Sequence, residues 1–243
     1  MNKTSIVVFG DSILKGVITI PESKNLFDVT ANDSLTLAQK ELGFELDNRS
    51  IYGNITSKGL VKLQKYLEKC SNGDLQAADF CIIEFGSNDC DYDWNIFPQD
   101  QAAPDFAGIE PKVPFDQYIE NLTQMVQLCR AHKITPVIMN LIPYICDRWF
   151  KTIAKAHNEQ AMLNFLEGSA DTLGKNQVRY QKALMDFAVN NNVQTIDAWT
   201  LFSEQKDAAS LMCDDGIHPN EKGYEVLSRL WIQRLPELKK EFN

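Results

Sequence analysis

The sequence predicts an α/β fold, a three-layer α/β/α arrangement in which helices cover both faces of a five-stranded parallel sheet. Five short apolar segments alternate along the chain with segments of helical periodicity, which is typical of parallel strands joined by right-handed crossovers. The segment 78–86 is a continuous apolar run ending at Gly86, the pattern of a strand buried on both faces. With 243 residues, 44% of them hydrophobic, the chain can bury a substantial core, and we expect a single domain over residues 1–243.

The first half of the chain is expected to hold three strands and two helices. The apolar segment 5–10 predicts a strand, and Gly10 lets the backbone turn sharply where it ends. Apolar residues at helical spacing predict a first helix, and a longer amphipathic pattern predicts a second. The two helices are expected at 35–42 and 56–70. An extended segment at 45–53 and the apolar run at 78–86 are expected to form the other two strands.

The second half opens on a long loop and then alternates again. Residues 91–113 mix Pro, Gly, Asp and aromatic residues and show neither helical nor strand periodicity, so we expect a loop. Loops of this length in compact domains are often functional. The remaining periodicities predict helices at 114–132, 147–166, 176–191 and 220–235, and strands at 135–143 and 193–199.

Composition excludes several classes of protein. A net charge of −9 and a pI near 4.9 argue against a nucleic-acid or anionic-membrane surface, which would need clustered Lys and Arg. Asp11 interrupts the N-terminal apolar run before a secretory signal is complete, and no stretch approaches the about 18 apolar residues of a membrane span. We expect a soluble, cytoplasmic protein whose six scattered cysteines are reduced and form neither a zinc nor a redox motif.

Candidate functional residues stand where the predicted strands end. In a doubly wound sheet, chemistry collects in the crevice at the carboxyl ends of the strands. Those ends carry the segments GDSI, YGNIT, GSND, LIPY and DAW, and DDGIHPN stands just before the last helix. Four of these six segments contain residues that suit acyl transfer. Taken alone, GDS is better explained as the capped start of a helix.

Three histidines are available as a general base. His132 ends a helix, where a cation favours the helix dipole, and His157 lies in the middle of a predicted helix, where we expect it to face solvent. His218 lies in a loop with Asp215 three residues upstream, so the carboxylate can curl back onto the imidazole Nδ1 and leave Nε2 free. DGIH is also compatible with a helix-start turn in which Asn220 is the cap.

Four motifs together resemble the SGNH hydrolases, also called the GDSL esterase and lipase superfamily. FGDSI, the glycine of IYGNIT, GSND at 86–89 and DGIHPN at 215–220 match in order and spacing along nearly the whole chain. The resemblance implies a flavodoxin-like sheet with strand order 2-1-3-4-5. It also implies a metal-independent serine esterase that works through an acyl-enzyme.

The resemblance assigns roles to five residues. Ser12 would be the nucleophile, His218 its base, and Asp215 the residue that orients the imidazole. The oxyanion would be held by the backbone N–H groups of Ser12 and Gly53 and by the side-chain amide of Asn88. Glycine also suits position 53 because a side chain there would crowd the substrate carbonyl.

Other residues near the motifs are alternative candidates for these roles or are expected to hold the site in shape. Gly59 is a poorer candidate than the glycine of IYGNIT because it lies inside a helical pattern. Asp197, after the fifth strand, is a candidate triad acid by position alone, and Asp215 is preferred because the family motif matches it. We expect Asp11 to cap or brace the GDS turn and Asp89 to hold its loop.

A calcium site is the alternative interpretation of the alternating carboxylates in DCDYDW. The turn-forming glycine of a calcium loop is missing, since Trp94 stands at the sixth position, and we expect neither a metal nor a cofactor. Aromatic residues in the two insertions beside the crevice fit a pocket lining or a private core of the insertions equally well: Trp94, Phe97, Phe106, Tyr144, Trp149 and Phe150.

The sequence therefore predicts hydrolysis of a carboxylic ester. We expect the substrate to be a small-molecule or carbohydrate ester with a short acyl chain, such as acetyl, because the cytosolic signals and the pocket-like loops favour a modest ester over a bulk lipid. The alternatives are a module that binds a nucleotide or phosphate in the same crevice, and a catalytically idle member of the family.

Overall fold

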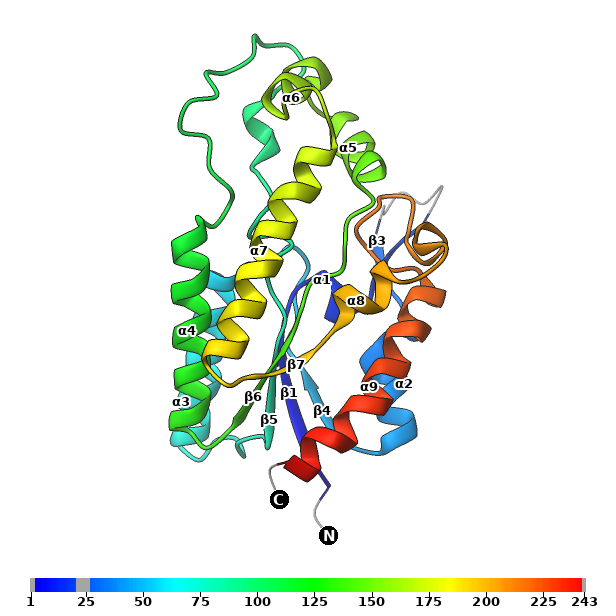
Figure 1. Cartoon of the computed structure of the whole chain (residues 1–243). Coiled ribbons are helices and arrows are strands. Elements are labelled where there is room, and N and C mark those ends of the chain that lie inside the picture. The colour runs from blue at the N-terminus through cyan, green and yellow to red at the C-terminus, as the bar shows by residue number, and fades with distance from the viewer. Residues whose placement is uncertain (1–2, 21–26, 242–243) are drawn as a thin grey trace.

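Five parallel strands form the centre of the computed structural model, which describes residues 3–20 and 27–241. Their spatial order is β4-β1-β5-β6-β7, which is the predicted order 2-1-3-4-5 (Figure 1). The predicted fold class is therefore confirmed. The strands are β1 (Ser5–Phe9), β4 (Glu45–Asn48), β5 (Phe80–Ile83), β6 (Thr135–Met139) and β7 (Gln194–Ile196).

Alternate side chains of β1 enter two separate apolar cores. Val7 and Phe9 pack on the face covered by α3 (Thr56–Ser71), α4 (Phe115–Ala131) and α7 (Asp171–Asn190). Ile6 and Val8 pack on the opposite face. That face is covered by α2 (Ser34–Leu42), α8 (Ala198–Ser203) and α9 (Glu221–Glu241), on the other side of the sheet in Figure 1. Within the described residues, no helix is long and apolar enough to cross a membrane.

The predicted helix over 147–166 is wrong in one respect, because it is broken in two. The structure has α5 (Cys146–Ala154) and α6 (Glu159–Phe165). Asn158 causes the restart, since its side chain accepts the N–H of Ala161 and its own N–H donates to the carbonyl of Phe97 in the long loop. His157 therefore lies in this break rather than in the middle of a helix.

The ends of two predicted strands are also different. The segment 193–199 forms the short β7, because Asp197 accepts the N–H of Thr200 and starts α8. The segment 45–53 is a strand only as far as Asn48. The helix start that the GDS segment suggested is present as α1 (Ser12–Lys15), capped by Asp11. A two-stranded antiparallel sheet that was not predicted follows it: β2 (Val17–Thr19) and β3 (Phe27–Val29).

The long loop and the α5–α6 segment build a third apolar cluster beyond the strand ends, at the top of Figure 1. The loop is irregular except for a short 3-10 turn, η1 (Trp94–Ile96). Trp94, Phe97 and Phe150 are buried in this cluster and Phe106 packs against it, so for these four aromatic residues the interpretation as a core of the insertions is correct. Tyr144 and Trp149 pack against the cluster and also face the pocket described below.

Gly59 is a packing residue of α3. A Cβ built on Gly59 would lie 2.3 Å from the ring of Phe85, so the helix approaches the end of β5 too closely for a side chain. We expect Gly59→Ala to lower the unfolding free energy by about 1–3 kcal/mol, the usual cost of overpacking. Urea denaturation would measure it, with Gln64→Ala on the exposed face as the control. Equal stability of the two variants would contradict the close packing.

Candidate active site

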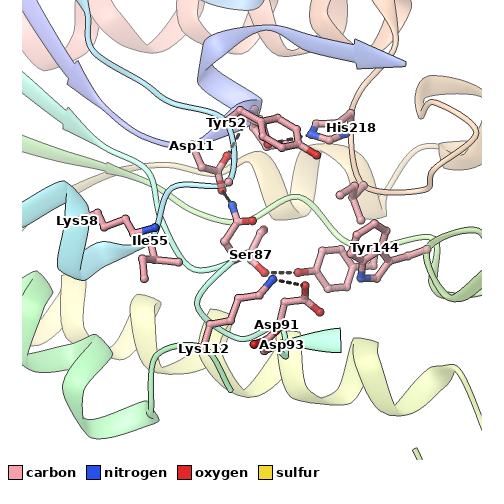
Figure 2. Close-up of a pocket in the computed structure, with 16 residues that line it drawn as sticks. Asp11, Tyr52, Ile55, Lys58, Ser87, Asp91, Asp93, Lys112, Tyr144 and His218 are labelled. Atoms are coloured by element: carbon pink, nitrogen blue, oxygen red, sulfur yellow. Dashed lines mark hydrogen bonds and ion pairs between the residues drawn. The ribbon is translucent and has the colours of Figure 1, made fainter. Parts of the chain in front are cut away.

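A pocket of about 550 Å³ opens at the carboxyl ends of β1 and β5 (Figure 2). Four residues predicted from separate segments line it, namely Ser12, Gly53, Asn88 and His218. Asp215 lies behind the imidazole and is buried. The structure thus brings together all five residues to which the motifs pointed.

Ser12, His218 and Asp215 form a continuous hydrogen-bonded chain. Nε2 of His218 lies 2.8 Å from Oγ of Ser12, and Nδ1 lies 2.5 Å from Oδ2 of Asp215. The exposed fractions of the three residues are only 6%, 1% and 4% in that order, so water competes little for these hydrogen bonds. This is the arrangement of a nucleophile, a general base and an orienting acid.

The loop before α9 holds the imidazole by a local turn. Oδ1 of Asp215 accepts the N–H groups of Ile217 and His218, both at 3.1 Å. Gly216 has φ of +78°, and a Cβ there would lie 2.6 Å from the carbonyl oxygen of Ile145, the residue before α5. The turn therefore requires glycine. Asn220 also caps α9, accepting the N–H of Gly223. Both interpretations of DGIHPN therefore hold at once.

Asp215 is suited to remain ionised. Burial alone would raise the pKa of its carboxyl, but the hydrogen bond and charge of His218 and the two backbone N–H groups outweigh burial and lower the pKa below its ordinary value. An ionised carboxylate fixes the proton on Nδ1 of His218, which leaves Nε2 free to take the proton of Ser12.

Three residues that the motifs suggested as hydrogen-bond donors, Ser12, Gly53 and Asn88, line the same pocket. Ser12 is the first residue of α1, where backbone N–H groups have no intrahelical acceptor, and Asp11 takes the next N–H, that of Ile13. Within the described residues, the N–H groups of Ser12 and Gly53 have no hydrogen-bond partner. The amide of Asn88 donates one N–H to Asp11 and keeps a second.

The model of the GDSL-like lipase/acylhydrolase family matches residues 8–226. The chain belongs to this family. In sequence it is 26% identical to the human isoamyl acetate-hydrolyzing esterase 1 homolog over 187 residues, which cover 76% of this chain and 66% of that protein. It is 23% identical to the isoamyl acetate-hydrolyzing esterase of Saccharomyces cerevisiae over 227 residues, which cover 93% of this chain and 83% of that protein.

Solved structures of GDSL-like proteins share the fold. The lipase/acylhydrolase from Enterococcus faecalis superposes with a TM-score of 0.60 at 19% identity, covering 96% of this chain and 95% of that chain. The psychrotrophic esterase EstA from Pseudoalteromonas sp. gives a TM-score of 0.60 at 15% identity, covering 98% and 100%. At these identities the likeness is one of fold.

Gly53 of this GDSL-like protein is required by its backbone. Its φ is +64°, and a Cβ built there would meet no protein atom within 4 Å. Crowding by the protein is therefore not the reason for glycine, and the left-handed conformation is. Two hydrogen bonds tie this turn to the carbonyl of Gly10, one from the N–H of Ile51 and one from the side chain of Asn54.

Buried carboxylates brace the GDSL motif and its neighbours, as predicted for Asp11 and Asp89. Asp11 accepts the N–H of Ile13 at 2.8 Å and the amide of Asn88 at 2.8 Å. Asp89 accepts the N–H and hydroxyl of Thr56, where α3 begins. Glu84, which was not predicted, accepts the N–H of Asp11. Burial raises the pKa of all three carboxyls.

Asp89→Asn is expected to remove a pH dependence of stability. Burial raises the pKa of Asp89 to about 7, whereas its ordinary value is 3.8. The folded protein therefore holds a proton that the unfolded chain releases, and the stability this gives below pH 3.8 is lost as the pH rises to about 7. Asparagine carries no such proton, so the stability of the variant relative to wild type should increase over this range by up to about 1.4 kcal/mol per pH unit.

Urea denaturation between pH 4 and 9 would measure this difference. We expect the two curves to diverge up to about pH 7 and then to run parallel, because Asp89 is ionised in both states above its folded pKa. Exposed Asp74→Asn is the matched control. A constant difference between Asp89→Asn and wild type over the whole range would contradict the raised pKa.

The other candidates from the sequence lie elsewhere. Asp197 accepts the amide of Asn140 at 2.7 Å as well as its capping N–H, and burial is outweighed by these bonds, so its pKa lies below the ordinary value. Nδ1 of His132 contacts the carbonyl of Leu128, and that of His157 contacts the carbonyl of Ile153. None of the three joins the Ser12 chain.

Several residues of the GDSL-like site were missed by sequence reasoning. The rings of Phe27 and Tyr52 contact the ring of His218, with centroids 5.6 Å and 6.1 Å away. Tyr52 could have been found, since it precedes Gly53 directly, but no periodicity marks Phe27. Lys58 and Lys112 also line the pocket and are labelled in Figure 2. They come from a helix and a loop that the sequence does not relate.

Proposed function

We propose that this protein is a carboxylic ester hydrolase that forms an acyl-enzyme on Ser12. The observation that carries the proposal is the chain from Ser12 through His218 to Asp215, with unbonded donors beside the nucleophile. Family membership and the names of the relatives, which are esterases, support the same reaction class.

The proposed reaction has two halves. Oγ of Ser12 attacks the ester carbonyl while Nε2 of His218 takes its proton, and the N–H groups of Ser12 and Gly53 and the amide of Asn88 hold the oxyanion. His218 then gives the proton to the departing alcohol, leaving an acyl-enzyme. Water attacks the acyl carbon, His218 takes a proton from it, and the acid and free Ser12 are released.

We further propose that the acyl group is short, with acetyl as the first candidate. The relatives are named for hydrolysis of an acetate ester, and the GDSL motif residues lie in one modest pocket. The reaction is proposed to take place in the cytoplasm, which fits the free state of all six cysteines.

A fluorophosphonate probe tests the nucleophile directly. We expect one covalent adduct, located at Ser12 by peptide mass spectrometry. In a separate series of acyl esters, we expect the rate of hydrolysis to fall as the acyl chain lengthens beyond a few carbons. The phosphate-binding alternative predicts the opposite: the probe does not label Ser12, and a nucleotide bound in the crevice protects the protein. An adduct on any serine other than Ser12 would contradict the proposed chemistry.

A further inference from the structure

The side of the pocket away from His218 carries a fixed ion pair. Nζ of Lys112 lies 2.8 Å from Oδ2 of Asp91, and the indole N–H of Trp94 donates to the other carboxylate oxygen at 2.9 Å. The backbone N–H of Lys112 donates to the carbonyl of Asp91 at 2.8 Å, so the two segments are also joined by their main chains. Asp91 is only 5% exposed. The ammonium group is therefore held in one place, and Figure 2 shows it pointing toward the middle of the pocket.

Further polar groups of the pocket have no partner. The indole N–H of Trp149 is buried without a hydrogen bond among the described residues. Lys58, on the wall opposite Tyr144 in Figure 2, forms no ion pair within the same part of the chain. Asp93, by contrast, has a partner: it lies beside Asp91 at the pocket, and its Oδ1 accepts the backbone N–H and the side-chain amide of Asn95, which leaves Oδ2 as a further acceptor. The lining thus offers both donors and acceptors at some distance from the nucleophile.

The balance of charges decides which ligand fits these groups. An aliphatic group would leave the buried indole N–H of Trp149 unpaired, at a cost in free energy. An anion would meet the carboxylates of Asp91 and Asp93 as well as the two lysines, so it would gain little from their charge. A hydroxyl group both donates and accepts, and it satisfies an ammonium and a neighbouring carboxylate together.

The shape of the pocket agrees with this chemistry. The volume of about 550 Å³ exceeds what an acetyl group needs and leaves room for a ring-sized alcohol. Three aromatic side chains, Tyr52, Tyr144 and Trp149, line it and supply flat surfaces against which the C–H face of a sugar ring can pack.

We propose that the alcohol part of the ester is hydroxyl-rich, a sugar or another polyol, and that Lys112 and Asp91 determine this specificity. This inference rests on the proposed ester hydrolysis. It separates the protein from relatives whose names specify isoamyl acetate, an ester of an aliphatic alcohol.

Two acetate esters test it, because they share the acyl group and differ only in the alcohol. We expect kcat/KM to be at least about tenfold higher for methyl 6-O-acetyl-glucoside than for isoamyl acetate, since a site built around hydroxyl groups disfavours a substrate that lacks them. Lys112→Met should lower this preference at least about tenfold, mainly through KM. A wild-type preference for isoamyl acetate, or an equal loss on both esters, would overturn the proposal.

Additional variants separate specificity from folding. Lys112→Met leaves the carboxylate of Asp91 buried without its cation, which can destabilise the loop, so the double variant Asp91→Asn/Lys112→Met removes both charges together. It should lose the sugar preference just as the single variant does. Exposed Lys182→Met on α7 is the matched control and should keep it.

A binding measurement distinguishes failure of this inference from failure of the proposed hydrolysis. Methyl glucoside, added to the wild-type protein, is expected to change tryptophan fluorescence because Trp149 lines the pocket, and the change should disappear in the double variant. Absence of turnover on every ester would refute the hydrolysis alone. Absence of glucoside binding, or binding that survives in the double variant, would refute the polyol specificity.

Discussion

Ser12→Ala is expected to lower kcat for an acetate ester by about 10⁴-fold or more. The hydroxyl of Ser12 is the group that His218 contacts at 2.8 Å, and alanine leaves the imidazole with no proton to take. The fold should be unaffected, because the backbone of Ser12 starts α1 and the cap comes from Asp11. Initial rates on p-nitrophenyl acetate, corrected for the reaction in buffer, would measure the loss, and thermal unfolding would confirm the fold.

The control for this experiment is another buried serine. Ser34→Ala on α2 removes a hydroxyl that forms no hydrogen bond among the described residues, so we expect wild-type rates. If Ser12→Ala retained the rate of wild type, Ser12 would not be the nucleophile. A rate lost equally in both variants would point to general damage to the protein.

The arrangement of the strands could be predicted because it depends on local pattern. The residues of β5, and those of β1 after Ser5, are all apolar, and only a strand covered on both faces buries them all. The break between α5 and α6 could not be predicted, because it depends on a distant contact: the N–H of Asn158 donates to the carbonyl of Phe97, 61 positions earlier. Likewise β2 and β3 are three residues each, too short for period alone to identify.

In the candidate site too, contacts between residues close in sequence could be predicted and contacts between distant residues could not. Asp215 and His218 are three residues apart, so their pairing needs only a local turn and was foreseen. Asp91 and Lys112 pair across a loop without periodicity, and in the sequence Asp91 resembled part of a calcium loop. Glu84 lies inside an apolar run, and its bond to Asp11 depends on β1 and β5 being neighbours in the sheet.

The role of Asn88 in the oxyanion hole can be separated from its role in the fold. Its amide donates to Oδ2 of Asp11 at 2.8 Å, and Asp11 in turn caps the turn that presents Ser12. This bond fixes the orientation of the amide before substrate arrives. In the proposed mechanism the second N–H is then positioned without reorganisation when negative charge develops on the substrate oxygen, and this preorganisation would be the source of its catalytic effect.

Asn88→Ala is therefore expected to lower kcat by about 10²–10³-fold, the usual effect of losing one oxyanion donor, while KM changes little because the donor acts in the transition state. Steady-state kinetics on p-nitrophenyl acetate would give both constants. The variant also deprives buried Asp11 of a hydrogen bond, so a stability loss of about 1–3 kcal/mol is expected alongside. Covalent labelling of Ser12 by a fluorophosphonate would show whether the nucleophile is still in place. If kcat stayed within twofold of wild type, the amide of Asn88 would serve the fold alone, and the N–H groups of Ser12 and Gly53 would have to hold the oxyanion by themselves.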